Sequence, residues 1–187
     1  MSKLKTLVVG CALSLACAAS FAQTPSQPPG FWSTPTIPGY GRMHMPDSPA
    51  YMPDPSHIYK IVFAVTQASR TPSDVNGALD HVARTVNLYV AAGVPLKNLK
   101  FVVIVGGAAA PTALDDAHYR AKFGIPNPNL QLISELEQAG VDVAVCGQAV
   151  PEHHFDYTWI DPKIKVALSE LTTVTVLQQQ GYALLPQ

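Results

Sequence analysis

Cys146 is the residue whose type and position are best suited to chemistry in this chain of 187 residues. It ends a short run, 141–146, in which Val and Ala predominate, and Gly147 follows it. Such a run predicts a buried parallel strand, and open α/β folds bind ligands at the edge where such strands end. Backbone N–H groups beyond the strand would favour the reactive thiolate. Burial as a small apolar side chain explains the same residue equally well.

Two histidines, His153 and His154, follow Cys146 in a segment that could fold back over the strand edge. Either imidazole could take the proton from Cys146 or stabilise its thiolate. Histidines are also common in surface loops, and that simpler interpretation is favoured. Adjacent positions suit a shared metal ion poorly, so no metal is expected.

Glycines at two predicted strand ends make up the candidate substrate-binding group, together with one amide side chain. Gly106 and Gly107 follow one strand, and Gly147 and Gln148 follow Cys146. The first pair lacks the remaining spacing and the distal acid of a dinucleotide site, so a tight turn is favoured and no cofactor is expected. A hydrolase is a weaker possibility, because no Gly-x-Ser-x-Gly nucleophile motif is present.

Strands and helices must alternate to position these residues. β-Branched and aromatic runs predict strands at 58–66, 99–105, 141–146, 164–168 and 182–185. Apolar spacing and end signals predict helices at 74–92, 111–123, 129–139 and 171–180, with Ser169 as an N-cap and 151–162 as a loop. This alternation requires crossover connections, so a parallel sheet covered on both faces is expected.

Residues 1–22 have the features of a secretory signal peptide. Lysines precede an apolar run at 7–19, and small residues at Ser20 and Ala22 suit cleavage after Ala22. The chain is therefore expected to be periplasmic or secreted, with Cys146 as its single remaining cysteine. A loose lipoprotein box that ends at Cys17 is the alternative, in which acylated Cys17 would anchor the protein.

The segment 23–57 contains nine of the seventeen prolines and is expected to be an extended arm before a domain at 58–187. A disordered spacer is the simpler interpretation, whereas its aromatic residues leave docking on the domain or on a neighbouring subunit open. The formal charge of −1 shows no basic excess, so nucleic acid is not an expected partner. No segment is apolar for long enough to predict a membrane span.

The order and spacing of several short segments resemble the DsrE/DsrF-like sulfur-relay family. These segments are 59–63, 129–130, 135–136, 139–141, 145–148 and 167–182. The resemblance implies a three-layer α/β/α sandwich with a mostly parallel five-stranded sheet, assembled as trimers or hexamers. It also implies that Cys146 accepts sulfur as a persulfide and exchanges it with a sulfur donor or acceptor protein.

Two features depart from that family. Relatives often carry a His-Gly pair after the second strand, where this chain has Gly106 and Gly107. The better-known members are intracellular, whereas this chain is expected to be exported. The sequence therefore predicts an exported sulfur carrier, and the alternative is a non-catalytic oligomeric binding or scaffold protein in which Cys146 is a buried core residue.

Overall fold

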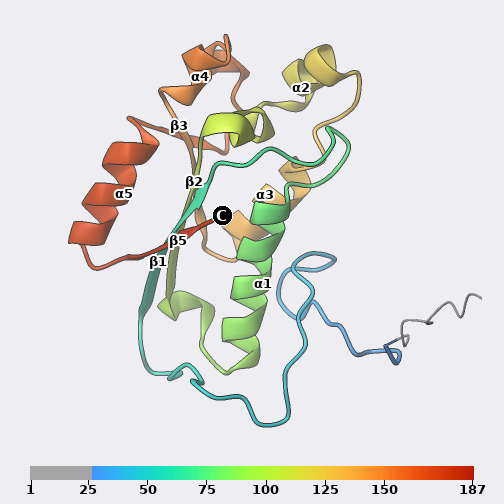
Figure 1. Ribbon diagram of the computed structural model, residues 1–187, viewed down its shortest axis with the longest axis vertical. Coiled ribbons are helices and arrows are strands. Elements are labelled where there is room, and N and C mark those ends of the chain that lie inside the picture. Colours follow the sequence, from blue (N-terminus) through green and yellow to red (C-terminus); the bar gives the residue numbers. More distant parts are fainter. Residues whose placement is uncertain (1–26) are drawn as a thin grey trace, which may run out of the picture.

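Five parallel strands form one sheet at the centre of the computed structural model, which describes residues 27–187 (Figure 1). In chain order they are β1 (Tyr59–Val65), β2 (Leu99–Val105), β3 (Asp142–Cys146), β4 (Lys165–Ala167) and β5 (Ala183–Pro186). Their order across the sheet is β4-β3-β2-β1-β5, and every neighbouring pair is parallel. The predicted α/β fold is confirmed, with all of its strands parallel. The predicted signal peptide, 1–22, lies outside the described residues.

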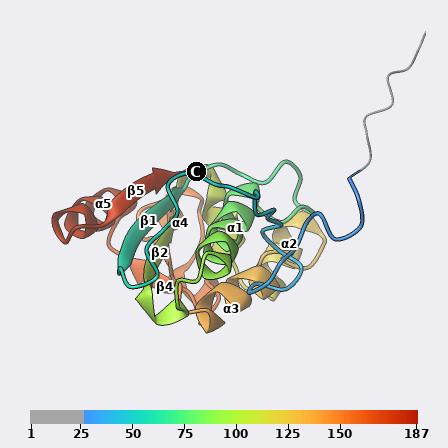
Figure 2. The ribbon, with the colours of Figure 1, turned by 90° about the horizontal axis from the view of Figure 1, so that it is seen from below.

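Helices connect successive strands and cover the sheet. They are α1 (Gly77–Ala91), α2 (Asp116–Phe123), α3 (Leu130–Gln138), α4 (Ala149–Glu152) and α5 (Glu170–Gln179), with 3₁₀ segments η1 (Leu96–Asn98), η2 (Gly107–Ala113) and η3 (Tyr157–Trp159). Helices α1 and α3 lie on one face of the sheet and α5 lies on the other (Figures 1 and 2). No helix within residues 27–187 is long and apolar enough to cross a bilayer.

Alternation along the strands supplies both faces of the sheet. In β1, Ile61, Phe63 and Val65 belong to the main core, whereas Val62 and Ala64 belong to a second cluster on the α5 side. The residues of α1 and α3 in the main core are Leu79, Val82, Ala83, Val86, Leu132, Ile133 and Leu136. From α5, Val174 and Leu177 pack on the second cluster, and both are partly buried. The strands are therefore apolar on both faces, as parallel strands covered by helices must be.

Two helices differ from the sequence prediction because a polar side chain caps a helix start inside each predicted range. Helix α1 begins at Gly77 rather than near residue 74, since Oδ1 of Asn76 accepts hydrogen bonds from the N–H groups of Ala78 (2.9 Å) and Leu79 (3.3 Å). The helix predicted at 111–123 is divided into η2 and α2. Leu114 and Asp115 between them have extended backbone, and Asp115 is the N-cap of α2.

The part of the proline-rich arm that the structure describes packs against α1 (Figure 1). Asn87, which is fully buried, joins the two segments. Its Oδ1 accepts from the N–H groups of Thr36 and Ile37, each at 2.9 Å, and its Nδ2 donates to the carbonyls of Tyr40 (3.0 Å) and Gly41 (2.9 Å). Ile37 is itself 1% exposed. This part of the arm is therefore packed onto the folded domain at α1.

Candidate functional site

Cys146 is the last residue of β3 and lies at the carboxyl edge of the sheet. Within residues 27–187 it is a free thiol. Only 7% of the residue is exposed, and its buried neighbours are the small side chains of Ala110 and Ala149. The prediction of a strand that delivers Cys146 to this edge is confirmed. The residue is, however, nearly buried.

The start of α5 supplies a hydrogen-bond donor to the sulfur. The backbone N–H of Glu170 donates to Sγ of Cys146 at 3.2 Å. Glu170 is the first residue of α5, and Ser169 caps this helix by accepting from the N–H of Leu171 at 3.2 Å. The sulfur therefore lies at the positive end of a ten-residue helix, a position that favours a negative charge.

The Glu170 carboxyl group lies close to Gly106 and to the Cys146 side chain, and sequence reasoning missed it. A Cβ built at Gly106 would overlap Oε2 of Glu170 and would lie 3.3 Å from Cβ of Cys146. Both side chains therefore border one point. Burial raises the pKa of Glu170 above its usual value. The Ser169 cap marks the start of α5, but the position of the helix beside β3 cannot be seen in the sequence.

Gly106 makes this close approach possible. It has extended backbone, with φ −149° and ψ −174°, so its role is steric and does not depend on an unusual conformation. Its own N–H donates to the carbonyl of Val65 at 2.9 Å. Of the four candidate substrate-binding residues, Gly106 is therefore the one whose missing side chain leaves room for Cys146 and Glu170 together.

Gly147 and Gln148 use their polar groups within the fold. The N–H of Gly147 donates to the carbonyl of Ala167 at 2.8 Å, and its carbonyl accepts from the hydroxyl of Tyr157 at 2.8 Å. Nε2 of Gln148 donates to the carbonyl of Leu168 at 3.0 Å. Gly147 was expected to offer a backbone donor to the thiolate, but its N–H is already engaged. The donor comes from α5 instead.

Neither His153 nor His154 makes a hydrogen bond to the sulfur. Nε2 of His153 donates to the carbonyl of Gly107 at 2.8 Å, so Gly107 is engaged with this ring. His154 is exposed and has a left-handed backbone, with φ 59°. The short helix α4 separates Cys146 from both rings, which line a different cleft. No hydrogen bond links either ring to the sulfur, and the role of these imidazoles at Cys146 stays a prediction.

The described residues do not form a metal site. Within residues 27–187, no group of three or more His, Cys, Asp or Glu side chains could hold a metal ion. The thiol of Cys146 lies next to the backbone donor of α5, and the partly buried carboxyl group of Glu170 is nearby.

Comparison with known proteins agrees with this fold. A search among curated proteins gives no match. Among solved structures, the chain resembles MTH1491, a protein of unknown function from Methanobacterium thermoautotrophicum, with a TM-score of 0.51 and 17% sequence identity. The match covers 69% of this chain and 99% of the other, and it concerns the fold alone. The DsrE/DsrF-like family matches residues 60–186, a range that includes all five helices and nearly the whole sheet. The chain belongs to the DsrE/DsrF-like family.

Proposed function

We propose that this protein carries sulfane sulfur as a persulfide on Cys146. The observation that supports the proposal is the hydrogen bond from the N–H of Glu170, at the start of α5, to Sγ of Cys146. A backbone donor at a helix N-terminus stabilises a thiolate, and the thiolate is the nucleophile in sulfur transfer. Membership of a family with sulfur-relay members supports the same chemistry.

The proposed transfer conserves atoms and electrons. The Cys146 thiolate attacks the terminal sulfur of a donor persulfide, R–S–SH, and a new S–S bond forms at Sγ. The S–S bond of the donor breaks, and its electron pair leaves on R–S⁻. The products are Cys146–S–SH and the donor thiolate, so no further oxidant or reductant is needed. An acceptor thiolate then removes the sulfur by the same exchange.

Glu170 would act as a positioning residue at this sulfur through the charge of its carboxyl group. In its neutral form the carboxyl does not repel the thiolate, whereas in its ionised form it does. Burial raises the pKa of Glu170, which extends the pH range in which the neutral form is present. Glu170 therefore makes the reactivity of Cys146 depend on pH.

Transfer must also expose a residue that is only 7% exposed. Helix α5 has no fully buried residue, and Leu168 and Leu171 at its start are 73% and 78% exposed. A segment with so few buried contacts opens locally at low cost in free energy. We therefore place the route to the sulfur at the first turn of α5.

The surroundings of the protein are part of the proposal. We infer that the signal peptide at 1–22 directs the chain to the periplasm or beyond, with acylation of Cys17 as the alternative. We also infer assembly into a trimer or hexamer and exchange with a sulfur donor or acceptor protein. Size-exclusion chromatography with light scattering measures the assembly, and mass spectrometry of the mature N-terminus identifies the cleavage site.

A second function is supported by the burial of Cys146 against Ala110 and Ala149. In that case the protein is a non-catalytic oligomeric binding or scaffold protein, and the cysteine fills space in its core. Thiol reagents would then label Cys146 only after denaturation. Cys146→Ser would fold and function normally.

Intact-protein mass spectrometry distinguishes the two functions. The mature protein is treated with glutathione persulfide, and Cys146→Ser serves as the control for reaction at other sites. A reducible adduct of one sulfur atom on the native protein, absent from the variant, is the expected result. If the native thiol is labelled by iodoacetamide and yet accepts no sulfur, the carrier function is wrong. If neither reagent reacts before denaturation, the scaffold function holds.

A further inference from the structure

A second site lies between α2 and α4, away from Cys146. We propose that this cleft binds a small organic anion with a flat aromatic body. It has a volume of about 460 Å³. The lining residues that matter here, called the aromatic cleft, are His118, Lys122, His153, His154, Phe155 and Trp159. Cys146 is not among the lining residues, so the proposal is independent of sulfur chemistry.

The two walls of the aromatic cleft come from segments that the backbone ties together. Leu114, just before α2, forms an antiparallel bridge with Ile160, just after η3. The N–H of Asp115 donates to the carbonyl of Trp159 at 2.8 Å, and the N–H of Asp161 donates to the carbonyl of Ala113 at 2.9 Å. These backbone contacts join the two walls directly. A preformed site loses little entropy when a ligand binds.

Several aromatic rings line the aromatic cleft. The rings of His118 and Trp159 stack at 4.8 Å between centroids and 11° between planes. The rings of His153 and Phe155 stack at 5.6 Å and 21°. Phe155 and Trp159 also lie near each other, at 6.3 Å between centroids. Surfaces built from several rings favour flat ligands, because stacking adds to the burial of apolar area.

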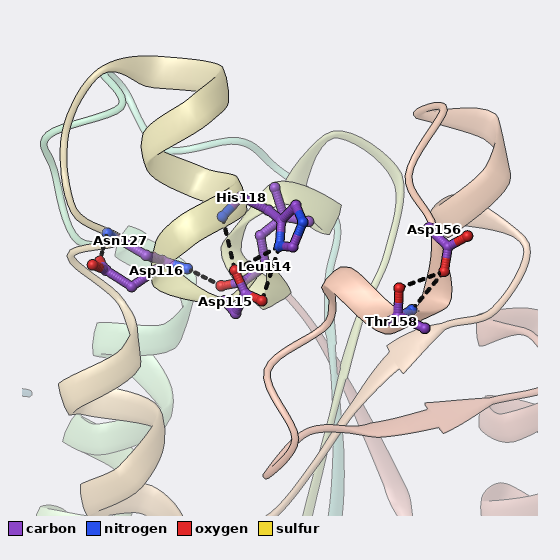
Figure 3. A network of polar contacts seen from close by, with 7 residues as sticks. All are labelled: Leu114, Asp115, Asp116, His118, Asn127, Asp156 and Thr158. Carbon is purple, nitrogen blue, oxygen red and sulfur yellow. Dashed lines mark hydrogen bonds and ion pairs between the residues drawn. The ribbon is translucent and has the colours of Figure 1, made fainter.

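His118 is held in a defined orientation by Asp115 (Figure 3). Its Nδ1 donates to both carboxylate oxygens of Asp115, at 2.8 and 2.9 Å. With Nδ1 engaged by Asp115, the other ring nitrogen, Nε2, makes no hydrogen bond to any residue between 27 and 187 and is free to contact a ligand.

Lys122 adds a positive charge to the rim of the aromatic cleft. Its Nζ lies 5.3 Å from the ring centroid of Phe155, and no carboxylate among the described residues lies within 4.0 Å of it. None of the described side chains that line the cleft is acidic. Asp156, which is near His118 but outside the lining, accepts from the N–H and the hydroxyl of Thr158 at 2.8 and 2.7 Å (Figure 3). The charge of Lys122 is therefore available to an anionic group.

Volume and lining together define the class of ligand. A cleft of about 460 Å³ is near the lower end of the usual range for small-molecule sites. One or two fused rings fit such a space, and a carboxylate or sulfonate on the ring can reach Lys122 and His118. A neutral ring of the same shape would keep the stacking and lose the charged contacts.

Binding of 2-naphthoate to the whole mature protein tests the proposal, with 2-naphthamide as the neutral match. The chain has two tryptophans, so ¹H–¹⁵N spectra contain two indole signals, and Trp32→Phe assigns them. We expect 2-naphthoate to shift the Trp159 signal saturably and to leave the Trp32 signal in place. Calorimetry should show that 2-naphthamide binds about tenfold more weakly.

Charge variants complete the test. Lys122→Gln should weaken 2-naphthoate binding about tenfold, while Lys97→Gln, a control in η1 at the other end of β2, should not change it. Three results would each overturn the proposal: no saturable shift at Trp159, equal affinity for the acid and the amide, or equal effects of the two lysine substitutions. Thermal unfolding of both variants confirms that they are folded.

Discussion

The backbone N–H of Glu170 lies 3.2 Å from Sγ of Cys146, although 24 positions separate the two residues in the chain. The same residue brings its partly buried carboxyl group to Gly106, where an added Cβ would also lie 3.3 Å from Cβ of Cys146. One residue thus presents a stabilising dipole and a titratable charge to one sulfur.

Glu170→Gln should increase the alkylation rate of Cys146 at pH 7. The substitution removes a negative charge close to the thiolate and keeps the backbone N–H in place. A charge a few ångströms away contributes about 1 kcal/mol, so we expect roughly a fivefold increase. Iodoacetamide kinetics from pH 4 to pH 8 measure it. The wild-type and variant rates should converge at low pH, and parallel profiles would contradict a role for the carboxyl charge.

Glu170→Gln should also change the pH dependence of the free energy of unfolding. The direction should be opposite to that expected when a paired carboxylate is removed. Burial raises the pKa of Glu170, so ionisation costs folding free energy once the pH rises through the folded value. Glu170→Gln removes this cost. Urea unfolding should show the variant gaining stability relative to wild type at pH 7 and losing that advantage below the unfolded pKa. An equal difference at both pH values would argue against the buried charge.

Gly106→Ala and Gly147→Ala form a matched pair with different neighbours. At Gly106 the new methyl group overlaps the flexible end of Glu170, which can move away. At Gly147 it would lie 2.5 Å from the backbone carbonyl of Ala167, which β4 holds in place. We expect the free energy of unfolding to fall by less than about 1 kcal/mol in Gly106→Ala and by about 1–3 kcal/mol or more in Gly147→Ala. Urea unfolding measures both, and similar costs would contradict this packing.

Asn87→Ala should release the arm from α1. The substitution leaves the N–H groups of Thr36 and Ile37 and two carbonyls without their partner. We expect a loss of about 2–4 kcal/mol in the free energy of unfolding, with faster proteolysis inside 27–57. Asn98→Ala, which removes one exposed hydrogen bond to the carbonyl of Pro55, should cost less than about 1 kcal/mol. Unchanged proteolysis in Asn87→Ala would show that other contacts hold the arm.

Asp115→Asn should lower stability at pH 7 but not at low pH. Desolvation acts to raise the pKa of Asp115, but the backbone and side-chain hydrogen bonds from His118 outweigh it and lower the pKa below its usual value. A lowered pKa contributes stability that is present above the unfolded value and disappears as the pH falls through the folded value. Urea unfolding from pH 7 to pH 2 measures the difference. Asn also caps helices well, so a constant difference would indicate a cost from capping rather than charge.

Some features depend only on short stretches of sequence, and these were predictable. The β-branched and aromatic run at 58–66 and the Ser169 cap act over a few residues, so they indicated the first strand and the start of the last helix. The strand that ends at Cys146 was visible for the same reason. Two helix predictions were wrong because a polar side chain caps a helix inside the predicted range. Asn76 caps α1 at a later start, and Asp115 caps α2 and so divides the helix predicted at 111–123.

By itself, then, the sequence determined the strands, most of the longer helices and a cysteine at a strand end, because backbone preference and apolar periodicity are local. Only the tertiary structure decided which groups surround that cysteine. The pairing of β3 with β4 and the packing of α5 bring Glu170 to Cys146, while α4 directs His153 to Gly107. Contacts between distant segments depend on how whole elements pack, and no short stretch of residues encodes that packing.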